Sequence, residues 1–315
     1  MRVAILGTWH VHAVKYVKTA LALGEVVGVY EENALWRREF AEKFNLYEFS
    51  SLGELLSSDC EGVIVCTSTN KHAEYITAAA RAGKHIFTEK VLALTEEECL
   101  KIKAAIEECG VRFVIAYQWK RMPGIMAAKS AVDEGLIGKV NYLRFRNCHS
   151  GSVNHWLPAH FYNEKECGGG AMIDLGAHGM YLADWFLGEP KSYMSSFTHF
   201  CSDGWDKENN PSALEDNAIT VMTYEGGAIA VNETGFVSVG SPAVFEVGGD
   251  LGYIVCKGNS CTVTLDRKEP KELPLPEGVK LPEECFLTGE EICGCGIDEA
   301  ITLTKMMVEA YKNCK

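Results

Sequence analysis

The stretch Gly83–Glu98, GKHIFTEKVLALTEEE, holds the end of one helix, a strand and the start of another helix. Gly83 predicts a helix end, and the run His85–Phe87 predicts a short strand. Thr95, with a glutamate three positions later, is the capping-box pattern that begins a helix. Lys90 therefore falls just past the carboxyl end of a strand, the edge where open α/β sheets bind ligands. There it either orients or protonates a substrate oxygen, or is a solvated surface lysine.

The first third of the chain repeats this alternation of short apolar strands and amphipathic helices. Strands joined by helices of this length indicate βαβ units, and therefore a parallel, doubly wound α/β sheet. After Ala116 the sequence becomes polar and aromatic, which divides a first domain, 1–118, from a second, 119–315. The expected strands of the first domain are 3–6, 26–30, 63–66, 85–87 and 111–116, and its expected helices are 13–23, 35–44, 73–82 and 96–109.

Composition indicates a globular protein of two domains. The chain has 315 residues, of which 47% are hydrophobic, enough for two sizeable cores. No apolar run reaches the roughly 18 residues that cross a membrane. The N-terminus lacks the long apolar region of a signal peptide. The net charge of −13 argues against nucleic acid and anionic membranes as partners.

The 13 cysteines are an odd number, and a disulfide framework is unusual in a chain of this length. We therefore expect reduced thiols and a cytoplasmic location. Cys293 and Cys295 could in principle be two ligands of a metal ion. Their spacing is tighter than that of the usual zinc pairs, however, and no second pair stands near them. No metal is expected.

The turn after the first strand, GTWHVHA, starts at Gly7 and is the place of the dinucleotide-binding fingerprint. Trp9 and His12 occupy the positions of the second and third glycines. Glu31 ends the next strand 24 residues after Gly7, where an acid accepts hydrogen bonds from a ribose diol and repels a 2′-phosphate. It therefore favours NAD over NADP. His10 and His12 either add donors to a phosphate or are exposed residues at a helix start.

Two more groups of polar residues lie in loops. Thr67, Ser68 and Asn70 follow a buried strand and can hydrogen-bond a cofactor, although Thr69 or Asn70 can equally cap the next helix. Further on, residues 147–162 hold three histidines and a tryptophan. The histidines have no regular spacing, so a sugar-binding loop fits at least as well as a metal site.

Asp174 and His178 follow the triple glycine 168–170. Their i, i+4 spacing puts both on one face of an expected helix that runs to about Phe186. An aspartate one turn before a histidine can orient its imidazole or share a substrate hydroxyl with it. The alternative is a structural pair on an exposed face. The many apolar neighbours indicate instead that this helix is largely buried.

Together these motifs resemble the Gfo/Idh/MocA family of oxidoreductases over roughly residues 1–190. The motifs that carry the resemblance are TSTNKH from Thr67, AGKH from Ala82, Glu89-Lys90, GLIG from Gly135, the glycines 168–170, Asp174 and His178. The resemblance implies an N-terminal Rossmann domain and a C-terminal α+β domain with a large, open, mainly antiparallel sheet. The uncovered face of that sheet is expected to join copies of the chain into a homodimer or homotetramer. The strands expected in the second sheet are 140–145, 195–200, 218–224, 228–234, 244–247, 253–256 and 262–265.

The resemblance implies hydride transfer between a nicotinamide cofactor and a carbon of a sugar, polyol or related hydroxy compound. It makes Lys90, Asp174 and His178 the catalytic residues. The expected cofactor-binding residues are Gly7, Thr8, Trp9, His10, His12, Glu31, Thr67, Ser68, Asn70, His72, Glu89 and Lys90. The expected substrate-binding residues are Lys120, His155, Trp156, His160 and Tyr181.

The sequence departs from the family pattern at several of these positions. Val91 replaces a proline, Lys120 stands where an arginine is frequent, and Tyr181 stands where an aspartate is common. Trp9 and His12 replace residues of the glycine turn. Two other functions suit the same fold: an NAD-using glycoside hydrolase that oxidises its sugar transiently, and a non-catalytic sugar sensor.

Overall fold

The computed structural model describes residues 1–201 and 214–314. The chain forms two compact units, Met1–Ala116 with Lys280–Thr304 and Tyr117–Val279 with Lys305–Lys315. The division into 1–118 and 119–315 stays a prediction. We describe each unit by itself.

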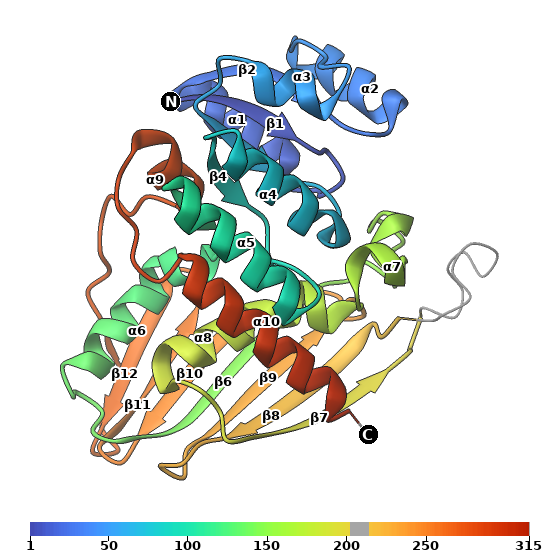
Figure 1. Cartoon of the computed structure of the whole chain (residues 1–315). Helices are drawn as coiled ribbons and strands as arrows, with labels where there is room; N and C mark the ends of the chain where they lie inside the picture. The colour runs from blue at the N-terminus through green and yellow to red at the C-terminus, as the bar shows by residue number, and fades with distance from the viewer. Residues whose placement is uncertain (202–213, 315) are drawn as a thin grey trace. The chain divides into compact units, whose positions relative to one another are not determined.

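The first unit contains a five-stranded sheet in which all neighbouring strands run parallel, in the order β2-β1-β3-β4-β5. Figure 1 labels β1, β2 and β4 of this sheet. In the sheet, β2 lies on one side of β1, and β3, β4 and β5 follow on the other side. This order confirms the doubly wound α/β arrangement. The strands are β1 (Arg2–Leu6), β2 (Glu25–Tyr30), β3 (Gly62–Val65), β4 (His85–Thr88) and β5 (Phe113–Ile115), and the helices that join them are α1 (Ala13–Leu23), α2 (Ala34–Phe44), α3 (Leu52–Ser57), the 3-10 turn η1 (Thr69–Lys71), α4 (His72–Arg81) and α5 (Glu96–Cys109).

Local signals set the helix ends of this unit. The capping box of Thr95 and Glu98 is confirmed at the start of α5, and Gly110 ends that helix in the left-handed conformation. The expected cap by Thr69 or Asn70 is wrong. A 3-10 turn precedes α4, no side chain caps that helix, and the Asn70 side chain instead accepts a hydrogen bond from Ser68.

A segment from near the C-terminus completes the first unit. Helix α9 (Pro282–Thr288) packs against α1, where the buried Glu283 pairs with Lys15 at 2.7 Å. The rings of Phe286 and Phe87 lie 5.9 Å apart, and the Ile115 N–H donates to the Cys295 carbonyl. This return of the chain therefore buries apolar surface of the parallel sheet.

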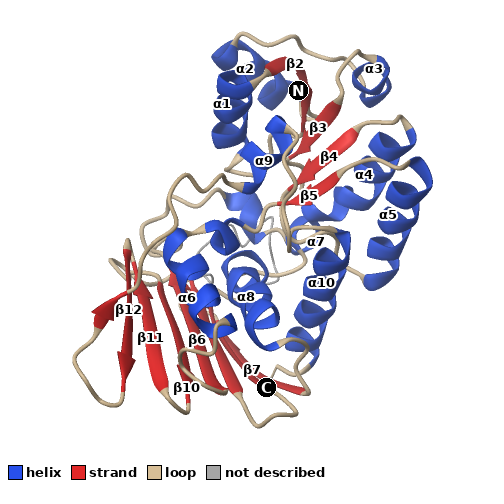
Figure 2. Cartoon of the chain, turned by 90° about the vertical axis from the view of Figure 1, so that its left-hand side faces the viewer, coloured by secondary structure: helices blue, strands red, loops and turns tan. Residues whose placement is uncertain are grey.

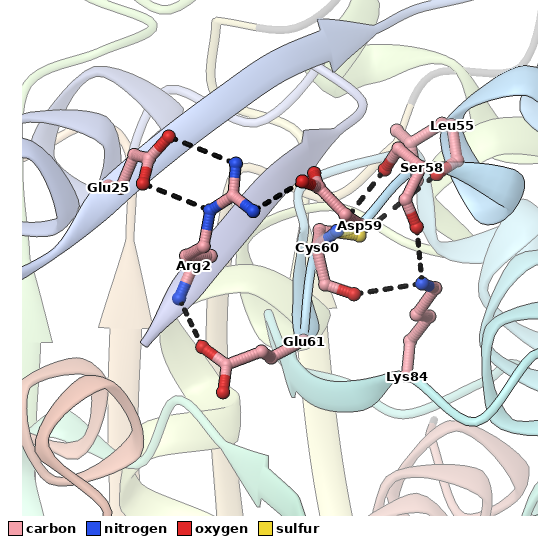
Figure 3. A network of polar contacts seen from close by, with 8 residues as sticks. All are labelled: Arg2, Glu25, Leu55, Ser58, Asp59, Cys60, Glu61 and Lys84. Carbon is pink, nitrogen blue, oxygen red and sulfur yellow. Dashed lines mark hydrogen bonds and ion pairs between the residues drawn. The ribbon is translucent and has the colours of Figure 1, made fainter.

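The amino ends of the strands carry a network of charged residues (Figure 3). Arg2, at the start of β1, pairs with Glu25 at 2.9 Å and with Asp59, and its backbone N–H donates to Glu61. Lys84 donates to two backbone carbonyls beside these acids, those of Ser58 and Cys60. Ligands of such sheets bind at the opposite, carboxyl ends of the strands, so we assign this network a structural role.

The second unit contains an eight-stranded sheet in the order β13-β12-β11-β10-β6-β9-β8-β7. All neighbours are antiparallel except β6 and β9, which confirms the large, mainly antiparallel sheet. Helices α6 and α8 lie along one face of it (Figure 2). The strands are β6 (Val140–Cys148), β7 (Ser192–Thr198), β8 (Asn217–Thr223), β9 (Ile229–Gly235), β10 (Val244–Gly249), β11 (Gly252–Lys257), β12 (Ser260–Leu265) and β13 (Lys271–Glu272). The helices are η2 (Gln118–Arg121), α6 (Pro123–Asp133), η3 (Ala159–Tyr162), α7 (Glu164–Cys167), η4 (Met172–Gly176), α8 (Ala177–Leu187) and α10 (Ile297–Lys312), the last of which begins in the first unit.

The two faces of the eight-stranded sheet differ in chemistry. Along β6, Leu143 and Phe145 are buried on the helix-covered face. The alternate residue Arg144 pairs with Glu233 of β9 at 2.6 Å and with Glu246 of β10 at 3.0 Å. The face away from the helices therefore carries cross-strand ion pairs in the middle of the sheet.

Candidate active site

The carboxyl edge of the parallel sheet is closed tightly around Gly7. This residue has φ +89°, a conformation that favours glycine. A Cβ on Gly7 would stand 2.4 Å from the Thr67 Cγ2 atom and 2.6 Å from the Thr67 N atom. The ends of β1 and β3 therefore approach each other closely only because residue 7 has no side chain.

The turn after β1 presents backbone N–H groups at the start of α1. The Thr8 N–H donates to Glu31 at 2.8 Å, and the His12 N–H donates to the ring of His10 at 3.2 Å. Both acceptors are side chains, which a ligand oxygen can replace. No side chain caps α1, and its first turn contains no acidic residue. This helix start therefore fits a phosphate group, with Trp9 and His12 in place of glycines.

Glu31 directly follows β2, which ends at Tyr30 and not at Glu31 as expected, and it is 9% exposed. Its second carboxylate oxygen accepts a hydrogen bond from the Asn33 N–H at 3.0 Å. Arg37 donates to the Glu31 backbone carbonyl at 2.7 Å. The carboxylate is thus held beside the β1 turn, where it has further lone pairs for a ribose diol.

Glu89, at the end of β4, is the centre of a buried network. The His12 ring lies 2.8 Å and the His10 ring 3.6 Å from one carboxylate oxygen, and Tyr16 donates to the same oxygen. Burial raises the pKa of Glu89, but the charges of His10, His12 and Lys90 outweigh it and hold that pKa well below the ordinary value. The carboxylate is therefore ionised.

The same network has the donor set of a metal site. A ring nitrogen of His10, a ring nitrogen of His12 and an oxygen of Glu89 all lie within 4.8 Å of one another. This spacing suits three ligands of one ion. That the site works without a metal stays a prediction.

Lys90 is 5% exposed, so the surface-lysine alternative is wrong. His72, placed by sequence among the cofactor-binding residues, is fully buried and contacts the carbonyls of Val91 and Leu92 at 3.0 and 3.2 Å. Burial lowers its pKa, so the ring is neutral. His72 therefore fixes the backbone that follows Lys90.

The second unit holds His178 through Tyr181. The His178 Nδ1 atom lies 2.9 Å from the Tyr181 hydroxyl, and that hydroxyl accepts a hydrogen bond from the Trp119 N–H at 3.1 Å. Tyr181 is 1% exposed, and its ring stacks on Tyr117 at 4.2 Å. The tyrosine expected at the substrate thus fixes the orientation of the histidine.

Asp174 and His178 do not share one regular α-helix, contrary to expectation. Residues Met172–Gly176 form a π-turn, and α8 starts at Ala177. The wider turn is stabilised by Asn232, which donates to the Gly176 carbonyl at 2.7 Å. Such insertions are frequent at functional sites because they redirect side chains. The exposed-pair alternative is also wrong for His178, which is 6% exposed.

The glycines before this turn approach the protein itself. A Cβ on Gly170 would meet the Glu215 carbonyl at 2.0 Å, and the N–H groups of Gly170 and Met172 donate to the Glu215 carboxylate. Burial raises the pKa of Glu215, although hydrogen bonds from Tyr311 and the backbone oppose this. Glu215 was missed because no local pattern marks it.

The expected substrate residues fall into two groups. Lys120 is buried, and its ammonium lies 5.1 to 5.9 Å from the ring centroids of Tyr117, Tyr181 and Trp185. His155 and Trp156 are exposed, and His160 is half-buried in the same loop. Trp156 is 52% exposed, and its ring centroid lies 4.6 Å from that of His149.

The parallel sheet, the glycine turn at a helix start and the acid at the end of β2 define a dinucleotide-binding protein of the Rossmann type. Residues 1–117 match the oxidoreductase family with an NAD-binding Rossmann fold, and residues 125–255 match the GFO/IDH/MocA C-terminal domain. The chain belongs to this family. The resemblance, the oxidoreductase class and the NAD cofactor are thereby confirmed.

Named relatives are similar over different lengths. The chain is 28% identical to the 1,5-anhydro-D-fructose reductase of Ensifer adhaerens, over 80% of this chain and 76% of the reductase. It is 26% identical to the levoglucosan dehydrogenase of Pseudarthrobacter phenanthrenivorans, over 62% of this chain and only 55% of that enzyme. It is 28% identical to a D-xylose dehydrogenase of Paenarthrobacter nicotinovorans, over 77% and 68%.

Solved structures share the fold of the whole chain. A levoglucosan dehydrogenase in complex with NADH and levoglucosan superposes with a TM-score of 0.84 at 19% identity, over 99% of this chain and 96% of that one. An aldose–aldose oxidoreductase from Caulobacter crescentus has a TM-score of 0.82 at 20% identity, over 99% and 97%. Among the residues that the structure describes, no helix is long and apolar enough to cross a membrane.

Proposed function

We propose that this protein is an NAD-dependent dehydrogenase that oxidises a secondary hydroxyl of a sugar, a polyol or a related compound. The observation that carries the proposal is the carboxyl edge of the parallel sheet. There the Gly7 turn, the uncapped start of α1 and the Glu31 carboxylate lie together. The family match and the sugar-directed names of the relatives support the same substrate class.

The cofactor would be held by residues of the first unit. The pyrophosphate would replace the side-chain acceptors of the turn and gain the N–H groups at the start of α1. His10 and His12 would add ring N–H donors there. Trp9 stands at the position of the glycine that normally lets the backbone approach the pyrophosphate. Glu31 would accept hydrogen bonds from the adenosine ribose. Repulsion between Glu31 and a 2′-phosphate makes NADP the less favoured cofactor.

The bound nicotinamide supplies a hydride acceptor. His178 would take the hydroxyl proton of the substrate at Nε2, because Nδ1 is engaged by Tyr181. In that tautomer the Nδ1–H donates to the Tyr181 oxygen, which also accepts from Trp119. Lys90 and Asp174 remain the other residues proposed to be catalytic. Lys120, His155, Trp156, His160 and Tyr181 remain the residues proposed to bind the substrate.

A substrate panel tests the proposal. Purified protein is incubated with NAD and with levoglucosan, xylose, myo-inositol or glycosides, and NADH absorbance and released products are followed. NADH formation that is abolished in Lys90→Ala and in His178→Ala supports the dehydrogenase. Product release from a glycoside without net NADH would indicate the hydrolase, and sugar binding without turnover would indicate the sensor.

We also propose that the protein acts in the cytoplasm as a homo-oligomer. The face of the eight-stranded sheet away from α6 and α8 presents Arg144 with its two glutamates, and the exposed apolar side chains of Met194 and Ile219 lie on neighbouring strands. A mixed surface of this kind suits contact with another copy of the chain. Light scattering on the purified chain would give the number of copies.

A further inference from the structure

Two buried cysteines face each other across the hairpin of β11 and β12. Cys256 and Cys261 are register partners, and their sulfur atoms lie 3.0 Å apart. The hairpin turns between the flanking pair Lys257 and Ser260. In a hairpin with a two-residue turn, the flanking pair is hydrogen-bonded. Since pairs alternate along antiparallel strands, the next pair is the type whose side chains approach most closely.

This placement suits a covalent bond between the two sulfurs. A disulfide has an S–S length of about 2.05 Å and a Cβ–Cβ distance of about 3.5 to 4.5 Å. Side chains directly opposite in a non-hydrogen-bonded pair begin near the upper end of that Cβ range. The sulfurs of Cys256 and Cys261, at 3.0 Å, therefore need to close by only about 1 Å.

A small oxidant has a route to this pair. Cys256 lines a cavity of about 310 Å³ whose wall includes Trp119, Met122, Ile125 and Phe245. Helix α6 forms part of the same wall through Gly124 and Ile125, and it packs closely against both cysteines. A Cβ on Gly124 would stand 3.6 Å from the Cβ of each cysteine. The thiols are thus closed to bulky reagents and reachable from the cavity through Cys256.

The Cys256 thiol is also positioned by the helix. Its sulfur lies 3.3 Å from the Gly124 carbonyl, to which the S–H donates. Oxidation would remove the proton that Gly124 accepts and would change the wall of the cavity beside Trp119.

We propose that Cys256 and Cys261 form a reversible dithiol–disulfide site that a hydroperoxide oxidises through this cavity. The peroxide transfers one oxygen to the Cys256 sulfur, which becomes a sulfenic acid, while the peroxide leaves as water or an alcohol. The Cys261 sulfur then displaces the hydroxyl group, the S–S bond forms and a second water leaves. The two electrons lost by the sulfurs are gained by the O–O bond. The proposal is independent of the proposed dehydrogenase activity.

The test uses the full chain with hydrogen peroxide as the probe. Free thiols are alkylated in denaturant after oxidation, and the tryptic peptides are mapped without reduction. Peptides 208–257 and 258–267 contain one cysteine each, Cys256 and Cys261. The expected result is that these two peptides are joined by a disulfide and that dithiothreitol restores both thiols.

Matched variants separate this site from general oxidation. Cys256→Ser and Cys261→Ser should each abolish the loss of the two thiols, whereas Cys167→Ser, a buried cysteine of the same unit, should leave the joined peptides unchanged. Wild-type mapping alone is decisive if a variant fails to fold. Recovery of peptides 208–257 and 258–267 as separate alkylated species, while exposed Cys109 and Cys293 are oxidised, would overturn the proposal.

Discussion

Tyr181→Phe isolates the role of one buried oxygen in the second unit. The phenylalanine ring can keep the stacking contact with Tyr117 at 4.2 Å, so the packing is preserved. The change removes the partner of His178 Nδ1 and the acceptor of the Trp119 N–H. A buried N–H without a partner costs about 1 to 3 kcal/mol. The urea midpoint should therefore fall, with an unchanged slope.

The same change should slow catalysis by disturbing His178. Loss of one hydrogen bond to an imidazole that becomes charged corresponds to about 1.5 to 3 kcal/mol, or roughly 10- to 100-fold in kcat. KM for the sugar should change little if Tyr181 acts through the histidine. Steady-state kinetics on the substrate found in the panel would measure both constants.

A double-mutant cycle supplies the decisive control. In a His178→Ala background, Tyr181→Phe should cause no further loss of the residual rate, because the two residues act as one unit. An equal loss of rate in both backgrounds would refute the positioning role. A rise in KM with unchanged kcat would assign Tyr181 to direct substrate binding.

Three further predictions concern the first unit. Gly7→Ala should lower the free energy of unfolding in urea by about 3 kcal/mol, because an alanine there combines positive φ with a clash at Thr67. Gly83→Ala is the control: Gly83 has φ +71° and open space around it, so its loss should be about 1 kcal/mol. Equal losses in the two variants would contradict the clash. The pKa of Glu89 in the folded protein lies below its ordinary 4.5, so the stabilisation by this carboxylate is present above about pH 4.5 and is lost as the pH falls through the folded pKa. In Glu89→Gln, the urea midpoint should therefore decrease less steeply as the pH is lowered below 4.5 than it does in the wild type. The same decrease in both proteins would argue against the network. Glu31→Gln should narrow the preference for NADH over NADPH by about tenfold in a binding titration, since a unit of negative charge is removed near the 2′ position; an unchanged ratio would show that Glu31 does not set cofactor choice.

Much of the fold follows from local patterns in the sequence. The capping box at Thr95 and the apolar strands that alternate with helices predict the parallel sheet, because these signals involve residues within a few positions of each other. The return of Lys280–Thr304 to the first unit could not be predicted in this way. The apolar side chains of Cys285, Phe286 and Leu287 in α9 are of the kind that become buried, but the sequence does not show against which sheet.

The sequence predicted which residues belong to the candidate site better than it predicted which of them contact one another. Glu31 could be placed because its distance along the chain from Gly7 is typical of a nucleotide-binding unit. The network of His12 with Glu89 joins residues 77 positions apart, and no local spacing encodes it. Tyr16 lies one helical turn after His12, so both side chains are expected on the same side of the helix. This spacing indicated that they could share a partner, but it was not used in predicting the site.

The π-turn at Asp174 shows a third kind of limit. The i, i+4 spacing to His178 is that of an ordinary helix, so the sequence predicts one. Asn232, which lies 56 residues beyond Gly176 in the sequence, stabilises the wider turn because its side chain donates a hydrogen bond to the Gly176 carbonyl. A tertiary hydrogen bond thus overrides the local preference, as is common where a fold positions reactive side chains.

Titration of the purified protein with NADH tests the account most directly. Energy transfer from tryptophan to the nicotinamide is followed, and a denatured sample is checked for cofactor that was already bound. We predict saturable binding of NADH, weaker binding of NADPH, and about a tenfold loss of NADH affinity in His12→Ala, because one charge-assisted phosphate contact is removed. No binding of either nucleotide, with none carried through purification, would mean that Trp9 and His12 close the turn, and the dehydrogenase proposal would fall.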